Sequence, residues 1–309
     1  WDYWERNLDP DLFIDRTLKG QVEGKVILIT GGTSGIGQAT ALKIAEAGSA
    51  KAVIVCGRDQ EKIDETLKLA KKRGVKIVAY SADVSDEVGC AEFAKKLHEN
   101  HGGVDILVNN AGRSIRRALE HSYDRFHDFE RTMQVNYFGA LRITMALLPH
   151  MSAQKRGHVI NISSIGVLTN APRFSAYVAS KAALDAWTRC ASSEYSDRGI
   201  SFTTINMPLV KTPMIAPTKI YNNVPTLEPD EAADMIIRAI VYKPVRIATR
   251  LGVFGQVLHA FAPRIAQIVM NTSFRMFGDS DAAKGKKNEV VGPSADQLAL
   301  SNLMRGIHF

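Results

Sequence analysis

The chain has 309 residues, with 39 Lys and Arg against 32 Asp and Glu, and a formal net charge of +7 at neutral pH. Its hydrophobic share of 45% excludes a disordered chain, because enough apolar side chains are present to build a core. Three cysteines are too few for a disulfide scaffold and favour a reduced, cytoplasmic protein. The positive charge is mild and dispersed, so we expect a solvated surface and no nucleic-acid partner.

Residues 1–23 precede the first predicted strand. This segment is interpreted either as an arm that packs on a neighbour or as a linker from an upstream domain. Residues 1–10 contain charges and lack the apolar stretch of a signal peptide. No uninterrupted run reaches the roughly 18 apolar residues that a membrane-spanning helix requires.

Short runs rich in Val and Ile alternate with longer helical patterns through residues 24–250, which we interpret as one domain. The runs lack polar alternation, so both faces of each strand are expected to be buried, as in a parallel sheet covered by helices. This predicts an α/β, Rossmann-like doubly wound fold with right-handed crossovers and helices on both faces. The predicted strands are 25–30, 52–56, 75–80, 106–109, 158–163 and 200–206. The predicted helices are 35–47, 59–73, 86–101, 123–151 and 174–197.

Two later segments differ from this repeat. Residues 208–229 contain five prolines, which prevent a continuous helix and predict a structured loop over the substrate site. Residues 251–309 are predicted to form a helical extension and a tail of the same domain. Within them, residues 251–277 are apolar with helix-like spacing and have arginines around them.

A glycine-rich turn follows the first predicted strand and reads TGGTSGIG. Glycines allow the backbone to approach a pyrophosphate, and the helix that begins there points free N–H groups at the anion. The turn therefore predicts a dinucleotide site. Its residues are Thr30, Gly31, Thr33, Ser34, Gly35, Ile36 and Gly37.

The end of the second strand bears on the choice of nicotinamide cofactor. An acidic residue there would bind the ribose 2′-hydroxyl of NAD, but this chain has Arg58, whose guanidinium suits the 2′-phosphate of NADP. NADP(H) is favoured, and a merely solvated Arg58 is the alternative. The next two strands end in small or polar residues that allow a flat ligand to approach closely. These residues are Asp83, Val84, Asn110, Ala111 and Gly112.

A second group of residues predicts chemistry on a carbonyl. Tyr177 and Lys181 lie four apart and share one helix face, and Ser164 ends the fifth strand thirteen residues before the tyrosine. A phenol titrates near ~10, and a neighbouring ammonium lowers that pKa. We predict that Ser164 hydrogen-bonds the carbonyl oxygen and Tyr177 donates the proton. Lys181 would tune the phenol and hold the ribose. No metal is expected.

With these motifs, residues 24 to about 215 resemble the short-chain dehydrogenase/reductase superfamily. Asn136 looks like the family's helix Asn, which orders a water leading from the Lys to solvent, and Val210 and Thr212 fit residues that grip the nicotinamide carboxamide. Pro208 replaces a glycine of the family pattern and removes an N–H, which bears on the geometry of that loop. The resemblance implies a seven-stranded parallel sheet, a nicotinamide cofactor, and a dimer or tetramer.

A narrower resemblance covers nearly the whole chain. Strings such as NNAGRSIRRALEHSYDRFHDFERTMQVNYFGA and NISSIGVLTNAPRFSAYVASKAALDA are similar to bacterial fatty acyl-CoA reductases of wax-ester metabolism. This implies NADPH-dependent reduction of long-chain acyl-CoA to fatty aldehyde. The chain is then either a single-domain enzyme or the C-terminal domain of a two-domain, alcohol-forming reductase, and a first residue Trp1 fits the second. The alternatives are a carbonyl reductase or hydroxy-lipid dehydrogenase and, from another class, a non-catalytic nucleotide-binding regulator.

Coenzyme A carries phosphates, which predicts a basic rim at the carboxyl edge of the sheet. The candidates are Arg113, Arg116, Arg117 and Arg173. The alternative is that these arginines form salt bridges to Glu120, Asp124 and Asp128. The apolar run 251–277 is interpreted as core or dimer packing, an acyl tunnel, or peripheral contact with a membrane or lipid body.

Overall fold

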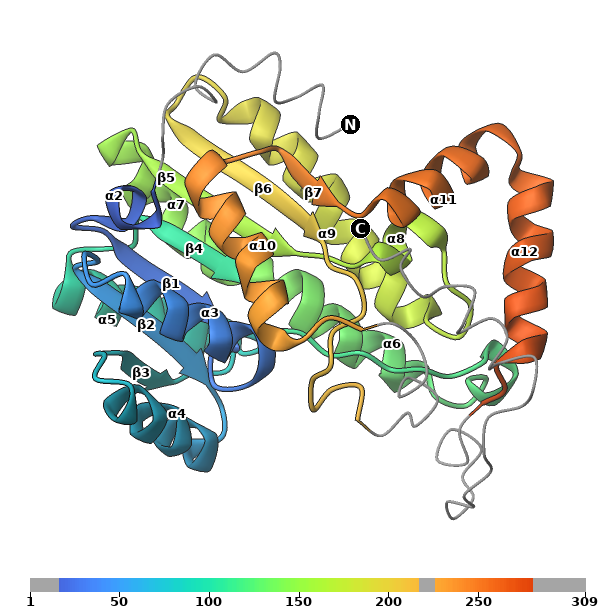
Figure 1. Ribbon diagram of the computed structural model, residues 1–309, viewed down its shortest axis with the longest axis horizontal. Helices are drawn as coiled ribbons and strands as arrows, with labels where there is room; N and C mark the ends of the chain where they lie inside the picture. The colour runs from blue at the N-terminus through green and yellow to red at the C-terminus, as the bar shows by residue number, and fades with distance from the viewer. Residues whose placement is uncertain (1–16, 217–225, 280–309) are drawn as a thin grey trace.

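A computed structural model describes residues 17–216 and 226–279 and shows a seven-stranded sheet (Figure 1). All neighbouring strands are parallel, in the order β3-β2-β1-β4-β5-β6-β7. The predicted α/β, doubly wound architecture is confirmed. The strands are β1 (Val26–Thr30), β2 (Ala52–Gly57), β3 (Val78–Ser81), β4 (Ile106–Asn109), β5 (Gly157–Ile162), β6 (Ile200–Asn206) and β7 (Arg246–Ala248).

Helices connect the strands and cover both faces of the sheet (Figure 1). The first part of the chain has α2 (Leu18–Val22), α3 (Gly35–Glu46), α4 (Gln60–Lys72), α5 (Glu87–His101), a short turn η2 (Leu119–His121) and α6 (Phe126–Met133). The middle has the π-helical segment η3 (Gln134–Gly139), α7 (Ala140–Gln154), α8 (Ile165–Thr169) and α9 (Ser175–Glu194). The last part has α10 (Pro229–Tyr242), α11 (Arg250–Phe261) and α12 (Pro263–Met276).

Alternate residues of the strands enter two separate cores. Ile27 and Ile29 of β1 belong to the core that contains residues of α3 and α10. Val26 and Leu28 belong to the opposite core, with residues of α5, α7 and α9. Because successive strand side chains point to opposite faces, a strand between two helical layers is expected to be apolar on both faces, as Val26, Ile27, Leu28 and Ile29 of β1 are.

Some elements differ from their predicted extents. The third strand begins at Val78, not at residue 75, and the helix predicted over 123–151 contains the π-helical segment η3. β7 has only three residues and is not among the six strands predicted from the sequence. A π-helical turn inserts an extra residue into a helix and is frequent at functional sites.

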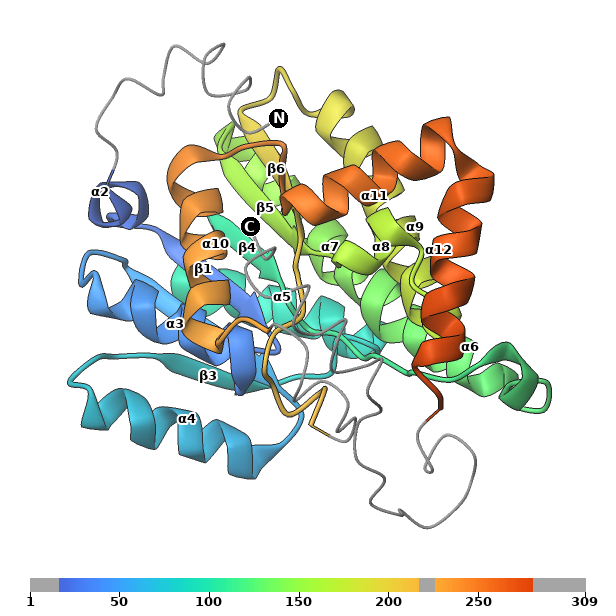
Figure 2. The ribbon, with the colours of Figure 1, turned by 45° about the vertical axis from the view of Figure 1, so that its right-hand side comes forward.

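The described C-terminal helices lie at one edge of the molecule (Figure 2). α11 approaches α8 closely, because a Cβ at Gly252 would lie 2.9 Å from Leu168 Cδ1. α12 then runs away from this contact toward η2. Among the described residues, no helix combines the length and apolarity needed to cross a bilayer. Most of the predicted N-terminal arm, part of the loop 208–229 and the tail from residue 280 lie outside the described residues.

Candidate active site

The glycine-rich turn after β1 is packed against the turn after β4. Gly31 has a φ of +63°, and a Cβ there would lie 2.9 Å from Ala111 Cα. A Cβ at Gly37 would lie 2.5 Å from Asn110 Nδ2 and 2.6 Å from the Gly31 carbonyl oxygen. Glycine at both positions is therefore required by close approach of backbone, and α3 begins beside it with its N–H groups free to bind an anion.

Thr30 and Asn110 join the ends of β1 and β4. The Asn110 amide donates to the carbonyl oxygens of Thr30 (3.0 Å) and Gly31 (3.1 Å). The Thr30 hydroxyl accepts from the backbone N–H groups of Asn110 and Ala111, both at 3.1 Å. β1 and β4 are adjacent in the sheet, and the chain crosses from one half of the sheet to the other there, which is where such folds bind their ligands. Thr30 and Asn110, both predicted to contact the cofactor, thus also fix the shape of the glycine-rich turn.

Arg58 follows β2, next to the same turn. A Cβ at Gly57 would lie 2.6 Å from Thr33 Oγ1, so the end of β2 touches the turn directly. The Arg58 guanidinium lies 3.2 Å from Asp83 Oδ2, and its side chain is 64% exposed. Burial raises the pKa of Asp83, but hydrogen bonds from Ser85 and from Arg58 outweigh it and leave that pKa below its usual value. An exposed pair of this kind is worth only ~0–1 kcal/mol, so a phosphate can compete for the guanidinium.

Ser164, Tyr177 and Lys181 meet at the carboxyl end of β5. Ser164 caps α8, its Oγ accepting from the Gly166 N–H at 3.1 Å, and its side chain also hydrogen-bonds the phenol of Tyr177. Tyr177 and Lys181 lie one turn apart on α9, and the lysine side chain is buried. The Lys181 ammonium donates to the Ile162 carbonyl oxygen at 2.6 Å. The structure therefore brings together the three residues that were predicted to act on a carbonyl.

The predicted effect of Lys181 on the phenol is corrected by the structure. Burial raises the pKa of Tyr177, and the hydrogen bond from Ser164 only partly offsets it. Burial also lowers the pKa of Lys181 to about 8, against the opposing pull of the Asp185 carboxylate. The ammonium is directed to the Ile162 carbonyl, so it does not make the phenol acidic in the way that spacing alone suggested. A raised pKa keeps Tyr177 protonated at neutral pH, which is the form that a proton donor needs.

Asn136 lies in the π-helical segment and is fully buried. Its Oδ1 accepts from the Arg113 N–H at 2.7 Å, and its Nδ2 donates to the Arg113 carbonyl (2.9 Å) and to Ser180 Oγ (2.9 Å). A Cβ at Gly112 would lie 3.3 Å from Asn136 Oδ1 and 3.6 Å from Lys181 Nζ. Asn136 thus fixes the backbone that follows the β4 turn, beside the lysine.

Asp185 is a buried acid that was not singled out in the sequence. It follows Lys181 by one helical turn, is 5% exposed, and its Oδ2 accepts from Asn206 Nδ2 at 3.1 Å. Burial raises its pKa, and hydrogen bonds from Ser163 and Asn206 and the charge of Lys181 oppose that. The i, i+4 spacing of Lys181 and Asp185 was the signal that could have revealed it.

A cavity of about 610 Å³ opens over these groups. It is lined by the glycine-rich turn, the turn after β4, the group Ser164, Tyr177 and Lys181, and the segment after β6. In that segment, Val210 pairs with Leu227 across an isolated bridge, and a Cβ at Gly35 would lie 3.2 Å from Thr212 Cγ2. Thr212 therefore reaches the start of α3 despite Pro208, which also lines the cavity.

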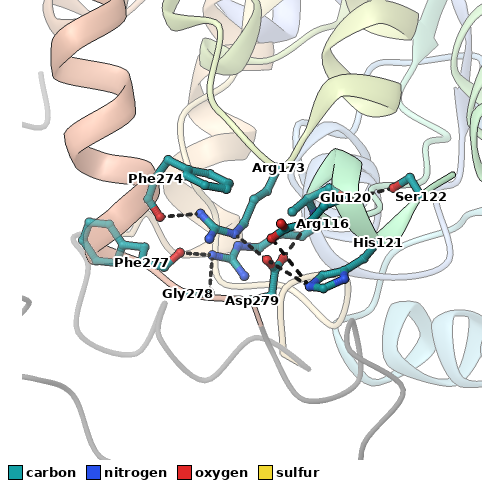
Figure 3. Close-up of polar contacts among 10 residues, drawn as sticks. Arg116, Glu120, His121, Ser122, Arg173, Phe274, Phe277, Gly278 and Asp279 are labelled. Atoms are coloured by element: carbon teal, nitrogen blue, oxygen red, sulfur yellow. Dashed lines mark hydrogen bonds and ion pairs between the residues drawn. The ribbon is translucent and has the colours of Figure 1, made fainter.

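The four arginines proposed for coenzyme A have different surroundings. Arg117 Nε lies 3.3 Å from Asp128 Oδ2, one of the acids named as an alternative partner. Arg173 pairs with Asp279 at 3.1 Å, and Arg116 donates to the carbonyl oxygens of Phe277 (3.1 Å) and Gly278 (2.9 Å) (Figure 3). Arg113 is exposed and forms no ion pair with the residues that the structure describes.

Comparisons with known proteins agree with this geometry. The short chain dehydrogenase family model matches residues 25–221. The chain is 50% identical over 296 residues, 96% of its length and 99% of the relative's, to a fatty acyl-CoA reductase of Acinetobacter baylyi. It is 41% identical to a fatty acyl-CoA reductase of Mycobacterium tuberculosis, over 85% of this chain and 90% of that one.

Among solved structures, a short-chain dehydrogenase from Streptomyces avermitilis is 29% identical, with a TM-score of 0.68 over 82% of this chain and 98% of that one. An NAD⁺-bound xylitol dehydrogenase, at 22% identity, shares the fold with a TM-score of 0.65 over 71% of this chain and 93% of that one. The matched family model spans the glycine-rich turn, Ser164, Tyr177 and Lys181. The chain is therefore an oxidoreductase of the short-chain dehydrogenase/reductase family.

Proposed function

We propose that this protein reduces long-chain fatty acyl-CoA to fatty aldehyde with NADPH. The observation that carries the proposal is the cavity in which Ser164 and Tyr177 face the glycine-rich turn, in a chain 50% identical to a fatty acyl-CoA reductase over nearly its whole length. The glycine cradle, where added Cβ atoms would collide with backbone, fits a dinucleotide pyrophosphate. The exposed guanidinium of Arg58 fits the 2′-phosphate of NADP(H).

When bound, the nicotinamide supplies a hydride to the thioester carbonyl carbon. As the C=O bond opens, negative charge develops on oxygen, and Ser164 and the protonated Tyr177 donate hydrogen bonds to it. The Tyr177 proton compensates this charge, and the Lys181 ammonium is expected to hold the cofactor ribose beside the phenol. As the carbonyl re-forms, its oxygen returns the proton to the Tyr177 phenolate, the carbon–sulfur bond breaks, and the coenzyme A thiolate leaves and takes up one proton from solvent. The balance is one acyl-CoA, one NADPH and one proton giving aldehyde, free thiol and NADP⁺.

No cysteine is placed to form an acyl-enzyme. Cys56 is buried within β2, where burial raises its pKa to about 12, and Cys90 is a buried residue of α5 with a pKa raised to about 11 by burial. Cys190 is exposed, between three and four turns of α9 beyond Tyr177, and does not line the cavity. Direct hydride transfer to the thioester is therefore the mechanism that these residues support.

Arg113 does not line the cavity, but it is the proposed coenzyme A contact whose cation forms no ion pair with the described residues. It follows the β4 turn, its backbone is held by Asn136, and its side chain is exposed. Arg116 and Arg117 line the cavity, but their guanidinium groups also contact protein atoms. A phosphate at this edge is expected to bind Arg113 first, since that cation forms no ion pair with the residues that the structure describes.

One assay tests the proposal against its alternatives. The protein is incubated with NADPH and hexadecanoyl-CoA while NADPH absorbance and free thiol are followed together. Thiol release that matches NADPH oxidation supports acyl-CoA reduction. Oxidation with aldehydes or ketones alone would establish a carbonyl reductase or hydroxy-lipid dehydrogenase, and no turnover of any carbonyl would favour the nucleotide-binding regulator.

We also propose that α11 and α12 make peripheral contact with a lipid surface. Phe254, Val257 and Phe261 lie on one face of α11 and are 63%, 48% and 87% exposed. Residues 250–278 contain no Asp or Glu, whereas Arg250, Arg264 and Arg275 are exposed, which suits an anionic bilayer. Flotation with vesicles that contain anionic lipid tests this. The double variant Phe254→Ser, Phe261→Ser should abolish flotation. If it instead dissociates a dimer and leaves flotation unchanged, this face of α11 belongs to subunit packing.

A further inference from the structure

A second cavity, of about 420 Å³, lies between η2, the segment before α9, and α12. Its walls are mainly apolar and include Leu119, Ala171, Pro172, Val178 and Phe274. A volume of this size falls within the range of small-molecule pockets. The walls come from segments more than 150 residues apart in sequence, so the cavity exists only because α12 folds back against η2 and the start of α9.

This cavity adjoins the catalytic one. Ala171 and Val178 line both, and Val178 directly follows Tyr177 on α9. The phenol of Tyr177 is therefore one position along α9 from Val178, a residue that lines both cavities. An apolar group that extends from a carbonyl at Tyr177 toward the second cavity therefore has to pass Ala171 and Val178.

Two arginines hold α12 in place as the outer wall. Arg173 lies 3.9 Å from the ring centroid of Phe274 and donates to the Phe274 carbonyl at 2.9 Å, while Arg116 donates to the carbonyls of Phe277 and Gly278 (Figure 3). The last carbonyls of a helix have no helical partner and carry partial negative charge, so cations are favoured there. The Arg173–Asp279 pair is nearly inaccessible, at 6% and 3% side-chain exposure.

The same cluster contains Glu120 and His121, whose ligand atoms lie within 4.8 Å of each other and of Asp279. The Arg173 guanidinium already pairs with the Asp279 carboxylate, so we assign no metal here. This ion pair fastens the chain after α12 to the segment before α9. Arg116 and Arg173 thus position Phe274, the aromatic side of the second cavity.

We infer that the second cavity is the acyl-chain subsite, in which the hydrocarbon tail of the thioester lies while its carbonyl faces Tyr177. The inference rests on the proposed function and adds to it the place where chain length is read. Apolar walls favour methylene groups, and each methylene removed from water is expected to raise kcat/KM about fourfold until the cavity is filled. Val178 and Ala171 are then the residues that determine whether a long chain can enter.

The test is the chain-length profile. kcat/KM is measured with NADPH for saturated acyl-CoAs from butanoyl to octadecanoyl, in the wild type and in Ala171→Phe, which adds bulk where the cavities meet. The ratio of the hexadecanoyl-CoA value to the butanoyl-CoA value should fall at least about tenfold, because several methylenes lose their burial. Ala91→Phe, at an exposed site on α5, is the matched control and should leave the profile unchanged.

Leu119→Ser is a second variant that adds no volume. Leu119 is 60% exposed, so its replacement leaves the core intact, yet it removes apolar wall from the distal end. It should lower the hexadecanoyl-CoA value several-fold and spare butanoyl-CoA. If the wild type reduces acyl-CoAs and both variants change all chain lengths equally, or none, the acyl-chain subsite is wrong and the proposed function stands. If the wild type reduces no acyl-CoA while reducing aldehydes, the proposed function itself fails, and the subsite with it.

Discussion

The cofactor side and the α12 side of the cavity are built in different ways. On the cofactor side, backbone and small polar side chains meet at strand ends: Thr30 and Asn110 join β1 to β4, and Asn136 holds the chain after that turn. On the α12 side, long arginine side chains reach across to the carbonyls of a helix end. Hydrogen bonds between strand ends fix geometry closely, whereas a wall held by long side chains can change shape without disturbing the chemistry.

We therefore expect the cofactor side to determine the rate of the reaction and the α12 side to determine which substrates bind. Substitutions on the cofactor side should change rate or cofactor choice for every substrate. Substitutions on the α12 side should change which substrates are accepted.

Tyr177→Phe should have the largest effect. Phe keeps the ring beside Phe174, whose centroid lies 6.3 Å away, and removes only the proton donor. Loss of general acid catalysis predicts a fall in kcat of about 10²–10⁴-fold for every chain length. Nicotinamide binding, measured by fluorescence, and the melting temperature serve as controls and should change little. Reduction at the native rate would show that the phenol is not the donor.

Arg58→Gln should alter cofactor choice and nothing else. Because the guanidinium is exposed, solvent weakens its attraction for the 2′-phosphate. The KM for NADPH is therefore expected to rise about tenfold, while the KM for NADH stays within about twofold. Lys68→Gln, an exposed cation elsewhere on α4, is the matched control. Equal changes for the two cofactors would assign Arg58 a structural role through Asp83.

Asp185→Asn should change the pH dependence of the rate. Lys181 has a pKa lowered to about 8 by burial, and the Asp185 carboxylate holds it up, so the ammonium and the rate should decline above about pH 8. Removing the carboxylate charge lowers that pKa further, and the falling limb of kcat should move about one pH unit lower. This predicts a loss of about fivefold at pH 8 with little change at pH 6. Asparagine preserves the contact with Asn206, so an unshifted profile would mean that Asp185 acts only in packing.

Arg113→Gln should have the smallest effect. An exposed cation contributes ~0.2–1 kcal/mol, so KM for acyl-CoA is expected to rise about two- to fivefold. A free long-chain aldehyde lacks the phosphates and should be unaffected. Arg198→Gln, an exposed arginine remote from the cavity in sequence, is the control. Equal effects on both substrates would remove Arg113 from the coenzyme A site.

Local pattern predicted the cofactor side well. The sheet, the glycine-rich turn and the Ser164, Tyr177 and Lys181 group depend on spacing within strands and one helix turn, which a sequence displays directly. β7 was not predicted from its own residues because three residues give no periodicity. The pKa of Tyr177 depends on burial and on where the Lys181 ammonium points, and neither can be read from spacing.

The α12 side was the harder part to predict. Arg116 and Arg173 have the composition of a phosphate site, and only the return of α12 shows that their partners are helix carbonyls and Asp279. Those partners lie more than 100 residues away in sequence. Contacts of that kind leave no mark in local pattern, so the cavity proposed as the acyl-chain subsite could not be predicted from the sequence.

In the proposed function, a hydride from the nicotinamide reaches the thioester carbonyl carbon beside Tyr177. The most direct measurement uses NADPH carrying deuterium on both faces of the nicotinamide C4, with hexadecanoyl-CoA, and mass spectrometry of the products. We expect hexadecanal with one deuterium on C1, formed together with one free coenzyme A thiol. Oxidised cofactor without labelled aldehyde, or an aldehyde whose C1 carries no deuterium, would contradict it.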